Sequence, residues 1–479
     1  MNRLLNKWSK IPLSVKVSTS YAMCSIIQRC ISFFTMPFFA RILTKEQYGQ
    51  VTIYNSWSGI LSIVITLNLA YGSFSTAMVK FDKDRESYIS SIEGICLVLA
   101  SLFFVIYLPF RKLWNSLFEL PTYIMCIMVV EILCLTAFQL WSGKQRFEFK
   151  YKLVIAITLL MTVLSVILQF FLVVSYEEKG FSRIIGAAIA TIIIGLFFYI
   201  WNAVKGKKLF NKKYWKYALE FNVPLLAYYL SQIVFNQSDR IMISHIVGTD
   251  KAAEYGVAYT LAFILTFVLN AINNSYVPWY YGKIKEGKTQ ENKSVSLGIA
   301  GIMSILILGV IWFAPEIISL MSGEQYLSAV NVVPPVAISL LLLFYSQLFI
   351  NVEFYYEEKK KLVWASIGSA LINIILNFIF IKIFGFIAAA YTTLISYSVF
   401  AFANCIAMKK VLKDKNVEDN AYDYKLLVCL FLGFVIVAYI GVAIYNYLIP
   451  RIIVCVIVVL ILFIKRNMII KLLMRIKTK

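Results

Sequence analysis

The sequence predicts an all-α integral membrane protein with about fourteen transmembrane helices. Hydrophobic residues make up 60% of the 479-residue chain, charged residues make up 15%, and the mean hydropathy is +0.77. Soluble domains carry roughly 25% charged residues. Apolar runs of roughly 20 residues, the length of a membrane-spanning helix, also recur along the chain. These observations together favour a multi-pass membrane protein over a soluble one.

Fourteen apolar stretches are long enough to cross a bilayer as helices. They lie at about 17–40, 51–72, 89–110, 121–140, 153–175, 184–204, 217–238, 252–275, 295–314, 330–350, 362–383, 386–408, 426–445 and 447–464. The longest connection, at about 409–425, is too short for a folded domain. The first stretch runs on to Leu43 without a small-residue cleavage site, so we expect a retained helix and not a signal peptide.

The distribution of Lys and Arg predicts the orientation of the helices. With the N-terminus placed inside, the inner segments carry 35 Lys and Arg and the outer connections carry 10. Because basic residues concentrate on the cytoplasmic side of membrane proteins, both termini are predicted to be cytoplasmic. The same bias accounts for the net charge of +21, so no nucleic acid partner is expected.

Similar segments slightly more than 200 residues apart predict an internal duplication. RILTKEQYGQ at 41–50 and HIVGTDKAAEYGV at 245–257 share a Tyr-Gly pair, and GAAIAT at 186–191 is similar to AAAYTT at 388–393. Repeated helical units of this kind are common in transporters. We therefore predict two pseudo-symmetric six-helix lobes, followed by two further helices and a basic cytoplasmic tail. The three parts are residues 1–205, 206–408 and 409–479.

Polar stripes on two corresponding helices support this duplication. The helical spacing of three and four places four polar residues on one face of the fifth stretch. They are Thr158, Thr162, Ser165 and Gln169. The matching positions of the second lobe are Ser366, Ala370, Asn373 and Asn377. Because such side chains avoid lipid, both stripes are predicted to face the protein interior, with Asn373 and Asn377 available to a polar cargo.

The helices that begin the two lobes carry the other candidate binding residues. One stripe on the seventh stretch consists of Tyr229, Gln232, Asn236 and Asp239. The matching positions on the first stretch are Ala22, Ser25, Arg29 and Ser32. We predict that both stripes line a polar cavity. The candidate substrate-binding residues there are Arg29, Ser25, Ser32, Tyr229, Gln232 and Asn236.

Arg29 is the only cation predicted to lie deep within a membrane helix, and Asp239 and Arg240 are adjacent at the outer end of another. A charged side chain in hydrocarbon must face a partner or a water-filled cavity. Arg29 is therefore either one half of a structural ion pair or the binding site for an anion. Its potential carboxylate partners are Glu93, Glu131 and Glu220. For Asp239 and Arg240, an outer gate and a structural ion pair both remain open.

The sequence offers no pattern typical of an enzyme, a metal site or a cofactor site. Asp82-Lys83-Asp84 matches the Asp-x-Asp motif of glycosyltransferases, but it lies in a short connection without a nucleotide-binding domain. His245 is the only histidine, whereas a zinc site needs several ligands. No Walker A motif is present. The eight cysteines lie in apolar stretches without a CxxC pair, so we interpret them as small buried apolar residues.

Several segments of the chain resemble those of Wzx-type polysaccharide flippases, in the multidrug/oligosaccharidyl-lipid/polysaccharide exporter superfamily. They are RILTKEQYGQ at 41–50, QSDRIMISHIVGTDKAAEYGV at 237–257, GEQYLSA at 323–329 and GFIAAAYTTLISY at 385–397. Each motif alone is modest. Their order and spacing, together with fourteen spans in two lobes, extend the resemblance over nearly the whole chain.

The resemblance implies a non-enzymatic flippase that works by alternating access and needs no cofactor. Its cargo would be an undecaprenyl-diphosphate-linked oligosaccharide, moved from the inner to the outer leaflet of a bacterial plasma (inner) membrane. The product would be a surface polysaccharide such as lipopolysaccharide O-antigen, capsule or exopolysaccharide. The implied partners are this polyprenyl-linked oligosaccharide, the lipid bilayer, and polysaccharide polymerase and chain-length proteins. The family's cationic cavity implies that Arg29 contacts the diphosphate.

Two other transport functions remain open. A multidrug or cation exporter of the same superfamily would need an acidic cavity, and Asp239 and Glu93 are among the acidic residues that keep this alternative open. A flippase for the peptidoglycan lipid precursor would have the same number of helices. Genes for glycosyltransferases and a polymerase beside this one would favour polysaccharide export over both alternatives.

Overall fold

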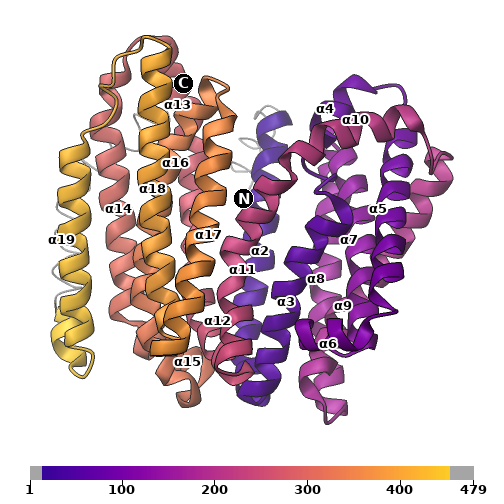
Figure 1. Cartoon of the computed structure of the whole chain (residues 1–479), viewed down its shortest axis with the longest axis horizontal. Coiled ribbons are helices and arrows are strands. Elements are labelled where there is room, and N and C mark those ends of the chain that lie inside the picture. Colours follow the sequence, from indigo (N-terminus) through magenta and orange to yellow (C-terminus); the bar gives the residue numbers. More distant parts are fainter. Residues whose placement is uncertain (1–12, 454–479) are drawn as a thin grey trace, which may run out of the picture. The chain divides into compact units, whose positions relative to one another are not determined.

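The computed structural model describes residues 13–453, apart from the side chains of residues 13–15, 18 and 359–362 (Figure 1). The described chain forms α-helices and three short 3-10 helices, with no strand among these residues. It divides into two compact units, Met1–Ser244 and His245–Lys479. The lobe boundary expected at residues 205/206 stays a prediction.

Unit 1 contains ten α-helices and one 3-10 helix among the described residues. They are α2 (Leu13–Ile42), α3 (Lys45–Thr66), α4 (Phe74–Lys80), α5 (Arg85–Tyr107), α6 (Arg111–Phe118), α7 (Thr122–Phe147), α8 (Tyr151–Ser175), α9 (Lys179–Gly206), α10 (Lys212–Asn222), η1 (Val223–Leu225) and α11 (Leu226–Ile246). The last helix runs two residues past the boundary of the unit.

Unit 2 contains eight α-helices and two 3-10 helices within its described part. They are α12 (Thr249–Phe263), α13 (Thr266–Lys285), η2 (Thr289–Glu291), α14 (Asn292–Trp312), α15 (Ala314–Ser322), η3 (Glu324–Val332), α16 (Val333–Tyr355), α17 (Lys359–Phe384), α18 (Ala388–Asp414) and α19 (Tyr424–Ala443).

Twelve helical segments of the described chain are long and apolar enough to cross a membrane. The prediction of an all-helical membrane protein is therefore confirmed. The predicted second span, at 51–72, corresponds to α3, which is not among the twelve because its first half is rich in polar residues. The predicted last span, at 447–464, lies mostly outside the described residues.

One helix in each unit is surrounded by its neighbours. In unit 1, α9 packs against α3, α5, α7 and α8, and its small residues permit close contact. A Cβ atom at Gly186 would lie 2.7 Å from the Cα of Gln169. In unit 2, α16 is apolar on all sides and packs against α12, α14, α18 and α19. These two helices organise the bundles on which the candidate site residues are arranged.

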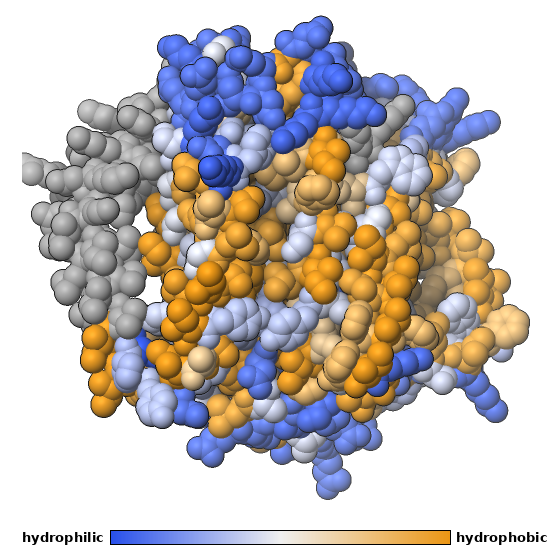
Figure 2. Space-filling model, turned by 60° about the vertical axis from the view of Figure 1, so that its left-hand side comes forward, coloured by the Kyte–Doolittle hydropathy of each residue, from blue (hydrophilic) through white to orange (hydrophobic). Residues whose placement is uncertain are grey.

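The outer surface has the polarity that a membrane requires. Figure 2 shows a broad apolar band between two polar ends. Exposed apolar side chains such as Phe378 on α17, Phe402 on α18 and Leu432 on α19 contribute to the apolar surface of unit 2. Because lipid is as apolar as these side chains, their exposure requires no protein partner within the bilayer.

Arg451 links the segment after α19 to helices α14 and α15. Its guanidinium forms a two-pronged salt bridge with Glu316, at 2.6 and 2.9 Å, and donates to the backbone oxygens of Trp312, Tyr445 and Tyr447. The residue is only 1% exposed. Every polar end of this arginine is therefore used to join three segments of unit 2.

Replacing Arg451 is expected to destabilise unit 2. Arg451→Met removes the charge but keeps an apolar side chain, and it leaves three backbone oxygens without this donor. We expect a loss of about 3 kcal/mol, at the low end for a broken buried pair because the Glu316 side chain keeps 38% exposure. Thermal unfolding of the purified full chain measures the loss. Exposed Lys410→Met is the control, and equal melting temperatures for the two variants would contradict the structural role.

Candidate functional site

Helix α2 buries one side against α8 and exposes the other. Gln28 Nε2 donates to Thr162 Oγ1 at 2.9 Å, and the rings of Phe38 and Phe170 lie 4.7 Å apart. The side chains that sequence analysis assigned to a cavity lie on the exposed side. They are Ser25, Arg29 and Ser32. Packing on α8 thus fixes the direction in which the Arg29 guanidinium is presented.

The polar stripe of α8 lies partly in the contact with α2. Thr158 donates to the backbone oxygen of Val154, and Thr162 donates to that of Thr158, so both hydroxyls satisfy part of their polarity within the helix. The four stripe residues are half-buried, which agrees with an orientation toward protein groups. Their remaining exposure leaves room for further hydrogen bonds.

Arg183 on α9 is a polar residue of this region that the sequence analysis missed. Its Nε donates to Gln169 Oε1 at 3.3 Å, and its guanidinium lies over the rings of Phe39 at 4.3 Å and Tyr48 at 5.2 Å. Its Nη1 is buried without a hydrogen-bond partner. The side chain joins α2, α3, α8 and α9 through stacking on aromatic faces, which stabilises a partly desolvated cation.

Helix α11 carries the second stripe and packs on α3. Ser56 Oγ donates to Gln237 Oε1 at 3.2 Å, and a Cβ atom at Gly59 would lie 3.3 Å from Ile233 Cδ1, so a small residue is needed there. The predicted binding residues of this helix are half-buried. They are Tyr229, Gln232 and Asn236. Asn236 Nδ2 also donates to the Gln232 backbone oxygen at 2.7 Å.

Asp239 and Arg240 point in different directions from α11. Consecutive side chains on a helix do not face each other. Asp239 is 1% exposed, whereas half-buried Arg240 turns back by one turn, and its Nη1 donates to Gln237 Oε1 at 2.6 Å and to the Asn236 backbone oxygen at 3.1 Å. The energetic coupling of Asp239 and Arg240, as a gate or a pair, stays a prediction.

The polar stripe of α17 forms part of the contact with α18. Ser366, Asn373 and Asn377 are at most 3% exposed. Asn377 Nδ2 donates to Asn373 Oδ1 at 3.2 Å, and Thr392 on α18 donates to Asn377 Oδ1. The stripe faces protein groups, as the sequence analysis predicted. In the described conformation these amides join two helices of unit 2, and their contact with a cargo stays a prediction.

The carboxylates considered as partners for Arg29 bind other groups in unit 1. Glu93 Oε1 accepts from Asn202 Nδ2 at 2.8 Å, and Glu131 accepts from the Tyr54 hydroxyl at 2.5 Å. Glu220 lies 3.7 Å from the ammonium of Lys216. The structure therefore gives each of the three acids a different structural role from the one proposed for it.

A charged cavity of about 250 Å³ lies at the end of unit 1 where α5 begins and α7 ends. Lys144 bridges Glu86 at 2.7 Å and Glu148 at 3.6 Å, while Lys150 lies 2.6 Å from Glu148. Burial raises the pKa of Glu148, but the hydrogen bond from Lys150 and the nearby basic charges outweigh burial and lower it below its ordinary value. Glu86 and Glu148 are thus neutralised by lysines of the same unit.

Asp82 and Asp84, the two acids of the Asp-x-Asp match, also line this charged cavity. Among the residues that the structure describes, no group of three or more His, Cys, Asp and Glu side chains is arranged to hold a metal ion. The basic residues Lys83, Arg85 and Lys205 share the lining with the acids. The arrangement is that of a mixed-charge surface at the end of the helices.

Comparison with known proteins identifies two family models that match this chain. The model described as "Polysaccharide biosynthesis protein" matches residues 14–281, more than half of the chain, and the MatE model matches residues 224–379. An "Uncharacterized membrane protein" of Haemophilus influenzae is 22% identical over 71% of this chain and 78% of its own length. "Lsg locus putative protein 1" of the same organism is 21% identical over 75% of this chain and 89% of its own.

Solved membrane transporters have the same fold. A lipid II flippase, MurJ, in an inward closed conformation aligns over 94% of this chain and 99% of its own, with a TM-score of 0.69 and 15% identity. An inward-facing multidrug resistance MATE family transporter of the MOP superfamily aligns over 79% of this chain and 95% of its own, with a TM-score of 0.62 and 13% identity. The TM-scores show that these proteins share the fold of this chain, and at such low identities the similarity concerns the fold alone.

Loss of the Arg183 contacts is expected to destabilise unit 1. Arg183→Met removes the cation over both rings and the hydrogen bond to Gln169, and we expect a loss of about 2 kcal/mol from the two together. Arg183→Lys keeps the charge without the planar stacking and is expected to lose less. Thermal unfolding of the purified chain tests whether Arg183→Met is less stable than Arg183→Lys, with exposed Lys112→Met as the control. An unchanged melting temperature in Arg183→Met would refute the role.

Proposed function

We propose that this chain, which belongs to the polysaccharide biosynthesis protein family whose model matches residues 14–281, is a flippase for lipid-linked oligosaccharides. Its cargo is an undecaprenyl-diphosphate-linked repeat unit, which it moves from the inner to the outer leaflet of a bacterial plasma membrane by alternating access. The repeat units serve the synthesis of O-antigen, capsule or exopolysaccharide. The fold shared with a lipid II flippase supports a lipid-linked cargo.

The observation that carries the proposal is the exposed polar side of α2. Arg29 lies more than ten residues from either end of a 30-residue helix and is exposed, together with Ser25 and Ser32. A cation turned toward hydrocarbon at this depth costs about 2.5–3.5 kcal/mol or more. We therefore infer that this side of α2 faces a water-filled path, in which the guanidinium meets an anionic group of the cargo.

The chemistry of the cargo suits such a path. The polyprenyl tail stays in lipid, and only the diphosphate and the sugars need polar surroundings. A guanidinium binds phosphate oxygens in a two-pronged geometry, so Arg29 is the proposed diphosphate contact. Hydroxyl and amide groups such as Tyr229, Gln232 and Asn236 provide hydrogen bonds to sugar hydroxyls without further buried charge. Asn373 and Asn377 are proposed cargo contacts of unit 2, where cargo hydroxyls replace their present hydrogen bonds.

The membrane potential favours the proposed direction of transport. Two negative charges that move outward from a negative interior gain about 5 kcal/mol per 100 mV, from roughly 2.3 kcal/mol for each charge. The excess of basic residues on the inner segments supports cytoplasmic termini for this orientation. Polysaccharide polymerase and chain-length proteins, which use the translocated units, are the partners proposed at the outer side.

A multidrug or cation exporter is the second candidate function. The MatE model match and the fold shared with a MATE family transporter favour it, and unit 1 buries the acidic side chains of Glu93 and Asp239 and half-buries that of Glu131. A peptidoglycan precursor flippase is the third, because MurJ has the same fold.

Deletion of the gene separates the three candidate functions. Accumulation of lipid-linked repeat units on the inner leaflet with loss of surface polysaccharide supports our proposal, whereas drug sensitivity alone or lysis supports the others.

Arg29→Ala is expected to abolish surface polysaccharide, because it removes the proposed counter-charge for the diphosphate. Arg29→Lys keeps the charge but loses the two-pronged geometry, so partial export is expected. Quantification of surface polysaccharide and of protein in the membrane tests both variants, and neighbouring exposed Cys30→Ala is the control. Normal export by Arg29→Ala at a normal protein level would falsify the anion site.

Asp239 and Arg240 are expected to be energetically coupled. If they form a gate or a pair, Asp239→Ala lowers the protein level or export, and Arg240→Ala in the same chain partly restores it. A double-mutant cycle on export and on protein level measures the coupling. Asp239→Ala combined with Arg111→Ala, on a different helix, is the additive control. Additive losses in both double variants would show that Asp239 and Arg240 act independently.

A further inference from the structure

The connection between α9 and α11 is the most basic exposed segment of unit 1. Residues 205–216, here named the basic connection, contain six lysines and no acidic residue. All six side chains are exposed. They are Lys205, Lys207, Lys208, Lys212, Lys213 and Lys216. The membrane-spanning segments on either side place this charge beside the headgroups of one leaflet.

The backbone of the basic connection is fastened to the start of α5. Ser87 Oγ donates to the Gly206 backbone oxygen at 3.1 Å, and Ser90 Oγ donates to that of Lys208 at 3.1 Å. At Gly94 a Cβ atom would overlap the Leu209 backbone oxygen, so only glycine permits this approach. The lysines therefore extend from a fixed support and not from a free loop.

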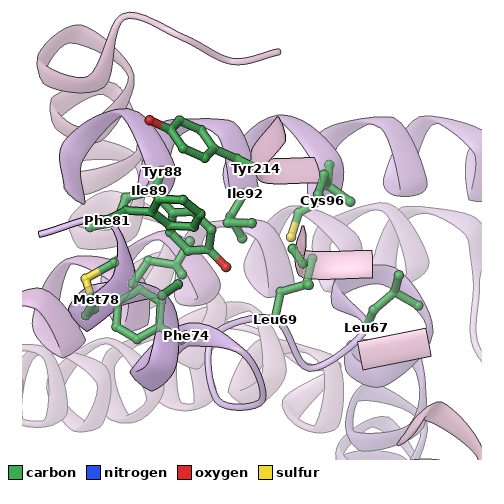
Figure 3. Close-up of a cluster of buried hydrophobic side chains, with 14 residues drawn as sticks. Leu67, Leu69, Phe74, Met78, Phe81, Tyr88, Ile89, Ile92, Cys96 and Tyr214 are labelled. Carbon is green, nitrogen blue, oxygen red and sulfur yellow. The ribbon is translucent and has the colours of Figure 1, made fainter. Parts of the chain in front are cut away.

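Helix α10 begins within the basic connection and is fixed in the same way. Asn211 caps its N-terminus by accepting from the backbone N–H groups of Lys213 and Tyr214. Tyr214 packs into the apolar cluster with Phe81 and Tyr88 (Figure 3). Trp215 Nε1 donates to the Ser91 backbone oxygen at 2.9 Å. One side of α10 is thus buried, and its lysines occupy the other.

Few protein groups neutralise these lysines. Lys216 lies 3.7 Å from Glu220, and the ammonium of Lys213 lies 5.4 Å from the centre of the Phe81 ring. For Lys207, Lys208 and Lys212, no carboxylate of the described residues lies within salt-bridge distance. Their ammonium groups are therefore available to an external group with negative charge.

Apolar side chains accompany the lysines. Leu209 is 43% exposed, Phe210 is 69% exposed and Phe221 is 38% exposed. Phe210 also contacts the edge of Trp215, at 4.8 Å between ring centres. Exposed aromatic and aliphatic groups beside lysines are typical of segments that lie in the headgroup region with their apolar groups among the acyl chains. A soluble anion would leave these apolar groups exposed to water.

We propose that the basic connection is a binding surface for anionic phospholipid headgroups of the bilayer. The lysines bind the lipid phosphates, and Leu209, Phe210 and Phe221 insert between the acyl chains. Basic clusters beside a membrane helix attract anionic lipids in this way, and the attraction is screened within about 8 Å at physiological ionic strength. This surface is separate from the α2 side that we propose for the cargo, and it anchors the chain that connects α9 to α11.

The test compares lipid association of the full chain in bilayers of equimolar phosphatidylcholine and phosphatidylglycerol. Spin-labelled versions of the two lipids report the fraction held at the protein surface. We expect the wild-type chain to prefer phosphatidylglycerol, and high salt to weaken this preference. Replacement of Lys207, Lys208, Lys212 and Lys216 by Gln is expected to reduce the preference severalfold, whereas replacement of the same four by Arg retains it.

A matched control carries the same change in charge elsewhere. The segment 283–293 also has four lysines, but Lys283 lies 2.9 Å from Glu291 and Lys288 lies 3.8 Å from Glu286. Replacement of Lys283, Lys285, Lys288 and Lys293 by Gln is expected to change the preference less. An unchanged preference in the first Gln variant overturns the proposal, as does an equal loss in both Gln variants. Removal of the wild-type preference by inorganic pyrophosphate at constant ionic strength would indicate a diphosphate site and also overturn it.

Discussion

The absence of water in the hydrocarbon of a bilayer is the constraint on which this structure depends. Every backbone N–H and C=O in that region needs an internal partner, so the described chain crosses it only as helices. Side-chain hydroxyls obey the same rule. Thr158 and Ser346, for example, donate to backbone oxygens one turn earlier in their own helices. Hydroxyl groups of this kind are thus satisfied within their own helix. Ionisable side chains need partners from other helices or from solvent.

Ionisable groups meet the constraint in three different ways. Glu93 is held by a neutral amide, that of Asn202. Arg451 has both a carboxylate and backbone oxygens, and Arg183 lies on aromatic faces. Each arrangement fastens helices together. Arg29 differs because its side chain is exposed on a helix whose other side is already packed. That difference, more than the presence of an arginine, is the reason to assign Arg29 a role in transport.

The sequence predicted those features that depend on local composition. Apolar runs located the helices, and helical spacing correctly placed the stripe of α17 toward protein groups. The sequence analysis failed where a property depends on residues distant in the chain. Arg183 lies just before the predicted span at 184–204, and nothing near it in sequence shows that Phe39 and Tyr48 lie against its guanidinium. Likewise the burial of Asn373 depends on α18, whose small residues Ala389 and Ala390 allow close packing on its neighbours.

The two matching polar stripes show that a repeated pattern need not keep one role. On α8 the stripe is half-buried, and Thr162 accepts a hydrogen bond from Gln28 on α2. On α17 the last two corresponding positions are Asn373 and Asn377, which bond to each other, and Asn377 also accepts from Thr392. An amide can both donate and accept, so these two side chains bond to each other at the interface. Hydroxyls that bond back to their own helix leave acceptor capacity unused. The repeated pattern thus joins two helices in unit 2 and leaves a half-buried stripe in unit 1, the unit that also contains exposed Arg29.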